Sequence, residues 1–158
     1  MHNKITLVLV IAILSSGCVS NENSDMNQSI IPKTNLPYGF SYLGMHETEV
    51  DIGGISMNTT EGVYRYNGED IYIQVIKSNN PEALLDQYKL QYKDYNYNPF
   101  KEISFNGHKA TLITDYMIKE GRQRLYYTLI WAKDNFMIII GSSKNAEAVI
   151  NLAIATGY

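Results

Sequence analysis

The chain has 158 residues, of which 45% are hydrophobic and 18% are charged, and its formal net charge is −3. The hydrophobic fraction argues against intrinsic disorder, and the length suits one domain of common size. The mild acidity argues against nucleic-acid binding, because no basic stripe is present to displace the counterions of a phosphate backbone. It equally provides no electrostatic attraction to an anionic membrane surface.

The N-terminus has the layout of a secretory signal peptide. His2 and Lys4 form a short, weakly positive segment, residues 5–14 (ITLVLVIAIL) form an apolar run, and the small residues 15–17 (SSG) follow. The run is too short for a transmembrane helix, which needs about 20 apolar residues. We therefore expect residues 1–17 to be a signal peptide and the protein to be exported.

Cys18 is the single cysteine of the chain and follows the apolar run directly. The segment Leu14–Cys18 (LSSGC) resembles a lipobox, at which a lipoprotein thiol receives a diacylglyceryl-type lipid and then becomes the new N-terminus. The usual pattern has Leu three residues before the cysteine, where this chain has Ser15. The alternatives are an ordinary signal peptide with an incidental cysteine, or a buried core cysteine. We predict lipidation at Cys18, because a lone thiol cannot form an intrachain disulfide and is a liability on an exported protein.

The segment after the cysteine is rich in Asn and Ser and has no hydrophobic period. Residues 18–35 are therefore expected to be a flexible tether, and residues 36–158 a single globular domain. Two glycosylation sequons begin at Asn27 and Asn58. Because sequons arise often by chance in an Asn-rich chain, each is only a candidate for a glycan.

The first half of the domain predicts strands followed by a helix. An irregular strand is expected at Leu36–Gly44, and strands at Gly62–Tyr66 and Ile71–Lys77 flank an Asn-Gly pair, the strongest short hairpin signal. The next segment predicts a helix that begins at Asn80-Pro81-Glu82, with an N-cap, a proline at the first helical position and an acidic first turn. The apolar stripe of this helix extends to about Tyr95.

The second half predicts an antiparallel meander and a last helix. Strands are expected at Glu102–Phe105, His108–Lys119, Gln123–Lys133 and Phe136–Gly141, joined by short polar turns. The run FMIII in the last of these is apolar at every position, which indicates a strand covered on both faces. The closing helix has Ser143 or Asn145 as its N-cap and ends at Gly157.

The fold class predicted is α+β: a twisted, mostly antiparallel sheet of about 6–7 strands with two helices packed on it. Because the late strands are apolar on both sides, both faces of the sheet need cover. We expect the N-terminal segment of the domain to cover the second face.

Several segments together resemble archaeal-type surface lipoproteins: LPYGF at residues 36–40, the Asn-Gly hairpins, LYYTLIWAKDNFMIIIGSS at residues 125–143 and the closing helix AEAVINLAIATGY. In element order they are also similar to the PsbP-like α/β/α sandwich, found in exported lipoproteins and in a photosystem accessory protein. The resemblance spans residues 36–158 and implies a non-enzymatic binding or assembly role. It transfers no functional residue to this chain.

The chain has no nucleophile elbow, phosphate loop, paired-cysteine metal site or zinc-binding His-Glu motif. We therefore expect neither an enzyme nor a cofactor. Glu47, Glu49 and Asp51 share one face if extended, and their oxygens suit a hard cation such as Ca²⁺. They lack the glycine turn that wraps such a cation, so the alternative is a charged, solvated edge strand that resists edge-to-edge pairing.

The chain has 13 tyrosines, most of them at a spacing that predicts packing between helix and sheet. Tyr95, Tyr97 and Phe100 are different, because no hydrophobic period accounts for them in the segment DYNYNPF. Tyrosine combines apolar area with a hydroxyl group and is common at wet interfaces. These three residues are the predicted contact surface.

Taken together, the sequence predicts a lipid-anchored, extracytoplasmic and non-catalytic module that binds an envelope protein or a small ligand. Its partners would be membrane lipid through Cys18 and this ligand, with no nucleic acid. The alternative is a structural or assembly subunit of a membrane or cell-envelope complex. A hydrolytic enzyme would require carboxylates from separate segments to converge.

Overall fold

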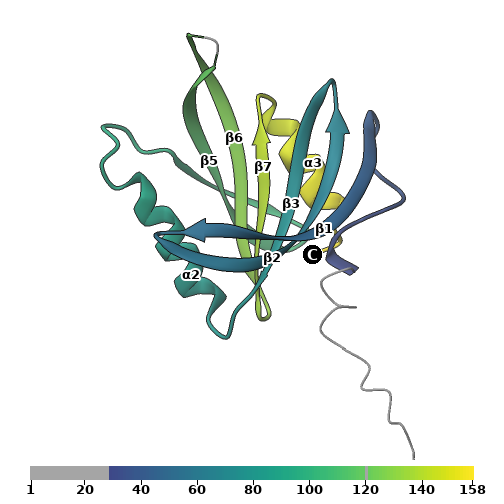
Figure 1. Cartoon of the computed structure of the whole chain (residues 1–158), viewed down its shortest axis with the longest axis horizontal. Helices are drawn as coiled ribbons and strands as arrows, with labels where there is room; N and C mark the ends of the chain where they lie inside the picture. The colour runs from purple at the N-terminus through teal and green to yellow at the C-terminus, as the bar shows by residue number, and fades with distance from the viewer. Residues whose placement is uncertain (1–28, 120) are drawn as a thin grey trace, which may run out of the picture.

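The computed structural model describes residues 29–119 and 121–158, so Cys18 and Asn27 lie outside the described residues. Seven strands form one antiparallel sheet (Figure 1). In chain order the elements are β1 (Phe40–Ile52), β2 (Ile55–Tyr66), β3 (Glu69–Lys77), α2 (Pro81–Lys89), the short 3₁₀ helix η1 (Leu90–Tyr92), β4 (Phe100–Phe105), β5 (His108–Lys119), β6 (Arg122–Lys133), β7 (Phe136–Ser143) and α3 (Ala146–Ala155).

The strand order is β1-β2-β3-β7-β6-β5-β4, which places β7 at the centre of the sheet. The predicted α+β class with a mostly antiparallel sheet and two helices is confirmed. No helix among the described residues has the length and apolar character needed to cross a membrane.

Local sequence explains the turns and the helix starts. Asn67-Gly68 and Asn106-Gly107 all have positive φ, the backbone that a two-residue hairpin turn needs and that Gly and Asn adopt most readily. The Asn80 side chain accepts a hydrogen bond from Ala83 N at 3.2 Å at the start of α2. Asn145 does the same for Glu147 N at 2.9 Å at the start of α3. The predicted hairpins and helix starts are therefore confirmed.

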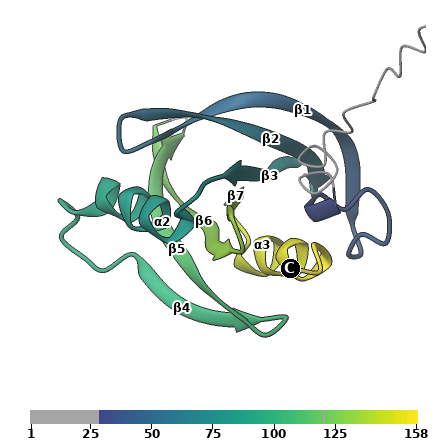
Figure 2. The same cartoon turned by 90° about the horizontal axis from the view of Figure 1, so that it is seen from below.

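The two helices lie on opposite faces of the sheet (Figure 2). Phe136, Ile138 and Ile140 of β7 pack against α3, together with the buried Trp131 of β6. Met137 and Ile139 alternate onto the other face, where Leu85 of α2 covers them. The expectation that the N-terminal segment covers the second face is wrong, because α2 covers that face.

The folded domain begins earlier than Leu36, the start expected from the sequence. Ile30 and Ile31 are 0% and 2% exposed and belong to the same core as α3. A Cβ atom at Gly62 would lie 2.5 Å from the Ile31 side chain, so the N-terminal segment packs directly on the backbone of β2. Pro32 O also accepts a hydrogen bond of 2.8 Å from the Tyr64 hydroxyl group. Part of the segment expected to be a tether is therefore part of the core.

We predict that Ile30→Ala lowers the free energy of unfolding by about 2 to 5 kcal/mol, because it leaves a cavity in a closed core. Leu43→Ala is the matched control, since Leu43 is 52% exposed on β1 and its loss should change stability by roughly 0.5 kcal/mol or less. Urea unfolding followed by the fluorescence of Trp131, the single tryptophan, measures both. Equal stability of the two variants would contradict the early domain start.

Candidate functional site

Two of the hollows on the described surface lie beside the free end of β5. One has a volume of about 390 Å³, and we call it the tyrosine pocket; it is lined by Asp94, Tyr95, Asn96, Tyr97, Asp115, Tyr116 and Gln123. The other has a volume of about 440 Å³, and we call it the ion-pair pocket; it is lined by Gly68, Glu69, Asp70, Tyr72, Met117, Tyr126, Ser142 and Lys144.

The tyrosine pocket forms where the segment after η1 passes the edge of β5. Strand β4 begins at Phe100 and pairs with β5 only as far as Ile113, so the later residues of β5 have no strand beside them on this edge. The Tyr95 hydroxyl donates to Asp115 Oδ1 at 2.9 Å, and the Tyr97 hydroxyl donates to Thr114 O at 3.3 Å. Two predicted tyrosines are thus fixed to the open edge of the sheet.

The tyrosine rings form a continuous series of contacts. Tyr92 and Tyr95 have ring centroids 5.1 Å apart, Tyr95 and Tyr97 are 5.3 Å apart, and Tyr97 and Tyr116 are 5.7 Å apart. The series begins beside α2 and ends on β5, and its last three rings are exposed by 38%, 36% and 48% in that order. Pairs in tilted or edge-to-face contact add stability beyond their buried area, so the exposed rings are held by their neighbours.

Asp115 influences the titration of this series. Its Oδ1 atom also accepts a hydrogen bond from Tyr116 N at 2.6 Å. Burial, together with the hydrogen bond to Asp115 and its charge, raises the pKa of Tyr95 to about 12. Burial and the same carboxylate also raise the pKa of Tyr97. Tyr95 and Tyr97 therefore remain protonated phenols at neutral pH.

Phe100 does not belong to the exposed surface, although the sequence grouped it with Tyr95 and Tyr97. It is half-buried and packs against the core under α2, with its ring centroid 5.6 Å from that of Tyr92. As the first residue of β4 it pairs with Ile113, and so shares the inward direction of that buried residue. Tyr95 and Tyr97 are therefore on the surface and Phe100 is not, and a contact role for the two tyrosines stays a prediction.

The sequence did not predict Asp94, Asp115, Tyr116 or Gln123 as partners of these tyrosines. Strand pairing and the path of a loop bring them together, and neither is visible in a local pattern. One signal was present: Tyr116, Met117 and Ile118 are three apolar residues in succession at the end of β5, where the usual alternation of a strand ceases, and all three are exposed.

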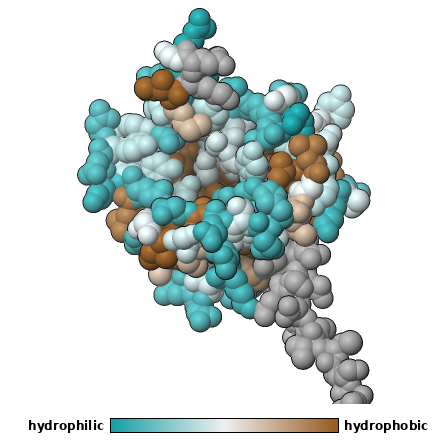
Figure 3. All heavy atoms as spheres, viewed as in Figure 1, coloured by the Kyte–Doolittle hydropathy of each residue, from teal (hydrophilic) through white to brown (hydrophobic). Residues whose placement is uncertain are grey.

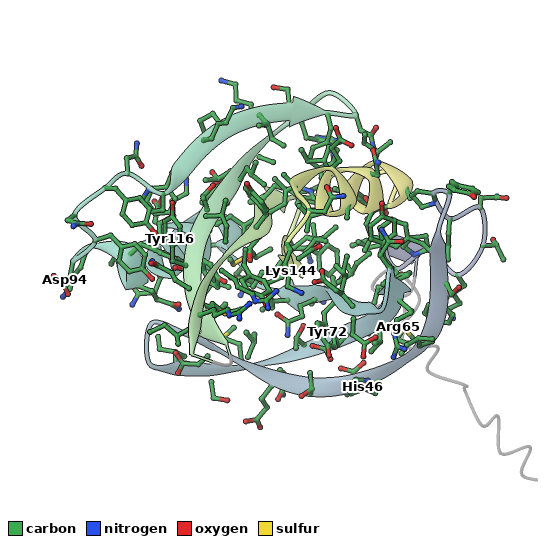
Figure 4. All side chains as sticks on the ribbon, turned by 90° about the horizontal axis from the view of Figure 1, so that it is seen from above. His46, Arg65, Tyr72, Asp94, Tyr116 and Lys144 are labelled. Carbon is green, nitrogen blue, oxygen red and sulfur yellow. The ribbon has the colours of Figure 1, made fainter. Side chains whose placement is uncertain are left out.

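The ion-pair pocket lies on the sheet face that carries α2, beyond the part that the helix covers. Figure 4 shows Lys144, Tyr72, Arg65 and His46 across this part of the molecule, whereas Asp94 and Tyr116 lie together at one side. Arg65 pairs with Asp70 and Lys144 pairs with Glu69.

Glu69 connects the ion-pair pocket to the start of α3. It also accepts a hydrogen bond from the Ser143 hydroxyl at 3.2 Å. Burial alone would raise the pKa of Glu69, but the hydrogen bonds and charge of Lys144 outweigh it, so the pKa is lowered. The same hydrogen bond raises the pKa of Lys144. Both groups are therefore charged at neutral pH, and this pocket is internally neutralised.

The predicted cation site on β1 does not come together. Glu47 accepts a hydrogen bond from Thr60 Oγ1 at 2.8 Å, Glu49 from Ser56 Oγ at 2.7 Å, and Asp51 from Gly54 N at 3.0 Å. Each carboxylate is thus bonded to its own neighbour along the β1–β2 hairpin. Among the described residues, no group of three metal-ligating side chains converges. The three carboxylates therefore form a charged face on an edge strand.

The remaining predicted sites are the two glycosylation sequons and the lipidation cysteine. Asn58 is exposed on β2, and a glycan there stays a prediction. The lipidation site Cys18 and the sequon at Asn27 are outside the described residues.

No protein-family model and no curated protein sequence matches the chain. In fold, the chain is similar to the crystal structure of a GTP binding regulator from Thermotoga maritima, with a TM-score of 0.50. The match covers 84% of this chain and 86% of that chain, at 12% sequence identity. At this identity the likeness concerns the fold alone.

We predict that Asp115→Asn lowers the pKa of Tyr95 from about 12 toward the ordinary value of 10.0, because it removes a negative charge beside the phenolate. The raised pKa favours the protonated folded state, so its contribution to stability is complete below pH 10 and is lost as the pH rises toward 12. NMR titration of ¹³C-labelled tyrosine measures the pKa, with Tyr95→Phe to assign the signal. An unchanged pKa in Asp115→Asn would contradict the role of the carboxylate.

Proposed function

We propose that this protein is a non-catalytic binding module, anchored by a lipid on Cys18 at the extracytoplasmic face of a membrane, and that the tyrosine pocket is its binding site. The observation that carries the proposal is the set of exposed rings of Tyr95, Tyr97 and Tyr116, of which the first two have hydroxyl groups bonded to β5. Rings held in this way present apolar area to a ligand at a low cost in side-chain entropy.

The chemistry of the pocket supports binding over catalysis. Its lining provides rings, amides and two carboxylates, the groups that orient a ligand. The one phenol in contact with a carboxylate is Tyr95, and its pKa is raised to about 12. A nucleophile needs a lowered pKa or an adjacent base that takes its proton, so the shift opposes this role.

The proposed fold assignment is the PsbP-like α/β/α sandwich. The presence of one helix on each face of a central antiparallel sheet supports it. The similar fold from Thermotoga maritima belongs to a protein described as a GTP binding regulator. We carry no ligand over from that protein, because at 12% sequence identity the likeness concerns the fold alone.

A second candidate function, an assembly subunit of an envelope complex, is favoured by the free end of β5. Ile118 is 81% exposed and Met117 is 39% exposed, next to Tyr116 at 48%. Figure 3 shows hydrophobic side chains at this end of the β5–β6 hairpin, above a face that is mostly hydrophilic. Exposed apolar side chains gathered at one tip support a protein contact there.

We predict that the native protein begins at Cys18 and carries a lipid there. Mass spectrometry of the protein purified from its own membranes should show a diacylglyceryl-modified N-terminal cysteine. Cys18→Ser should move the protein from the membrane fraction to the soluble fraction, because two acyl chains supply the attachment. Ser16→Ala, which keeps the cysteine and a small residue, is the control and should stay with the membrane. A native protein with an unmodified thiol would contradict the anchor.

We also predict that a photoreactive amino acid at Asn96 forms a specific adduct on intact cells. The adduct should disappear when Tyr97→Ala is added, since the ring makes the contact. Ile154, 47% exposed on α3, is the control position and should give no adduct. An adduct at position 118 with none at position 96 would instead support the assembly subunit, and no adduct at either would contradict both functions. Thermal unfolding of Tyr97→Ala should stay close to that of the parent chain, because Tyr97 is on the surface.

A further inference from the structure

The tyrosine pocket is negatively charged, and this property separates it from the ion-pair pocket. Asp94 and Asp115 line it, and its other lining residues are tyrosines and amides. In the part of the chain that the structure describes, no Lys, Arg or His forms an ion pair with either carboxylate. In the ion-pair pocket, by contrast, Glu69 and Asp70 are both paired with basic side chains.

The tyrosine pocket takes side chains from both faces of the sheet edge, because Asp115 and Tyr116 are successive residues of β5. Gln123 of β6 lines the tyrosine pocket. Asp115 pairs with Tyr126, so Arg124, two residues before Tyr126, points to the same face as Asp115, whereas Gln123 points to the face of Tyr116. Arg124 nevertheless forms no ion pair with Asp115 in the described part of the chain.

The rings are inclined to one another instead of forming a flat platform. The planes of Tyr95 and Tyr97 differ by 52°, and those of Tyr97 and Tyr116 differ by 78°. A stacked sugar ring or a nucleobase prefers one broad aromatic face. Rings inclined in this way present faces in several directions, and an exposed ring face attracts a cation.

Asp115 adds a fixed charge among the rings. Its Oδ1 atom accepts hydrogen bonds from both the Tyr95 hydroxyl and Tyr116 N, so the carboxylate is held between two members of the ring series. A desolvated cation gains from the ring faces and from such a carboxylate together. An anion would be repelled, and a bare metal ion would need a converging set of oxygen ligands that the described residues do not form.

We propose that the tyrosine pocket binds a quaternary alkylammonium group, such as a trimethylammonium head on a small molecule. This inference rests on the proposed function, since it names the ligand class of the same pocket. The volume of about 390 Å³ accommodates the head and a short substituent. The rings contact the methyl groups, and the carboxylates of Asp94 and Asp115 supply the opposite charge.

The test compares choline with 3,3-dimethyl-1-butanol, which has the same shape but carries no charge. The full chain is titrated with each compound in a polyoxyethylene detergent, whose head group is neither an ammonium nor a sugar. Calorimetry measures affinity, and ¹³C-labelled tyrosine NMR locates the site. Choline should bind at least tenfold more tightly than its neutral analogue, and the signals of Tyr95, Tyr97 and Tyr116 should shift.

Matched variants test separately how the aromatic ring, the carboxylate charge and the folded state contribute to choline binding. Tyr97→Leu should weaken choline binding about 3- to 30-fold, whereas Tyr97→Phe, which keeps the ring, should bind nearly as the parent does. Asp94→Asn should also weaken binding, and its effect should shrink at high salt because the carboxylate is exposed. Tyr38→Leu is the control, since Tyr38 is fully exposed and lies outside the pocket. If Tyr97→Leu loses its thermal transition, Asp94→Asn decides the charge contribution.

Equal binding of the two compounds would overturn the inference, since the pocket would then select shape and not charge. Absence of choline binding would overturn it as well. In either case the binding function stands if the adduct at Asn96 is found, and falls if it is not, so the two failures are distinguishable.

Discussion

The structure depends on a strand that is apolar on both of its faces. Phe136, Ile138 and Ile140 point to one side of β7, and Met137 and Ile139 point to the other. Such a strand is stable only if other parts of the chain pack against both of its faces. The central position of β7, α3 with the N-terminal segment on one side, and α2 on the other all satisfy this requirement.

The surfaces proposed for function follow from the small size of α2. With nine residues, it covers only part of its face. The uncovered part is polar. There, Glu61 Oε1 lies 3.3 Å from His46 Nε2, and Glu61 Oε2 accepts a hydrogen bond of 2.7 Å from Gln74 Nε2. The segment after α2 must then return to the sheet edge at β4, and this path takes Tyr95 and Tyr97 across β5.

The sequence predicted what is locally encoded and missed what long-range packing decides. Neighbouring residues determine the Asn-Gly turns, the N-cap at Asn80 and the strand that is apolar on both faces. The structure has all of these features. The burial of Ile30 could not be predicted from the sequence, because two isoleucines within a polar segment do not form a hydrophobic period. Similarly, the lack of a hydrophobic period at Tyr95 and Tyr97 predicted a surface, but only the path of their loop in the structure brings the Tyr95 hydroxyl group to Asp115.

The burial of Ile30 and Ile31 also sets how far the domain can stand from a bilayer. If Cys18 carries the proposed lipid, the length of residues 18–28 limits its distance from the described domain to about 40 Å, the span of a fully extended chain of that length. Figure 1 shows the beginning of the described chain and the free ends of β5 and β6 at opposite ends of the molecule. Under the proposed anchor, the domain would lie close to the membrane, with the free ends of β5 and β6 on the side away from the attachment point.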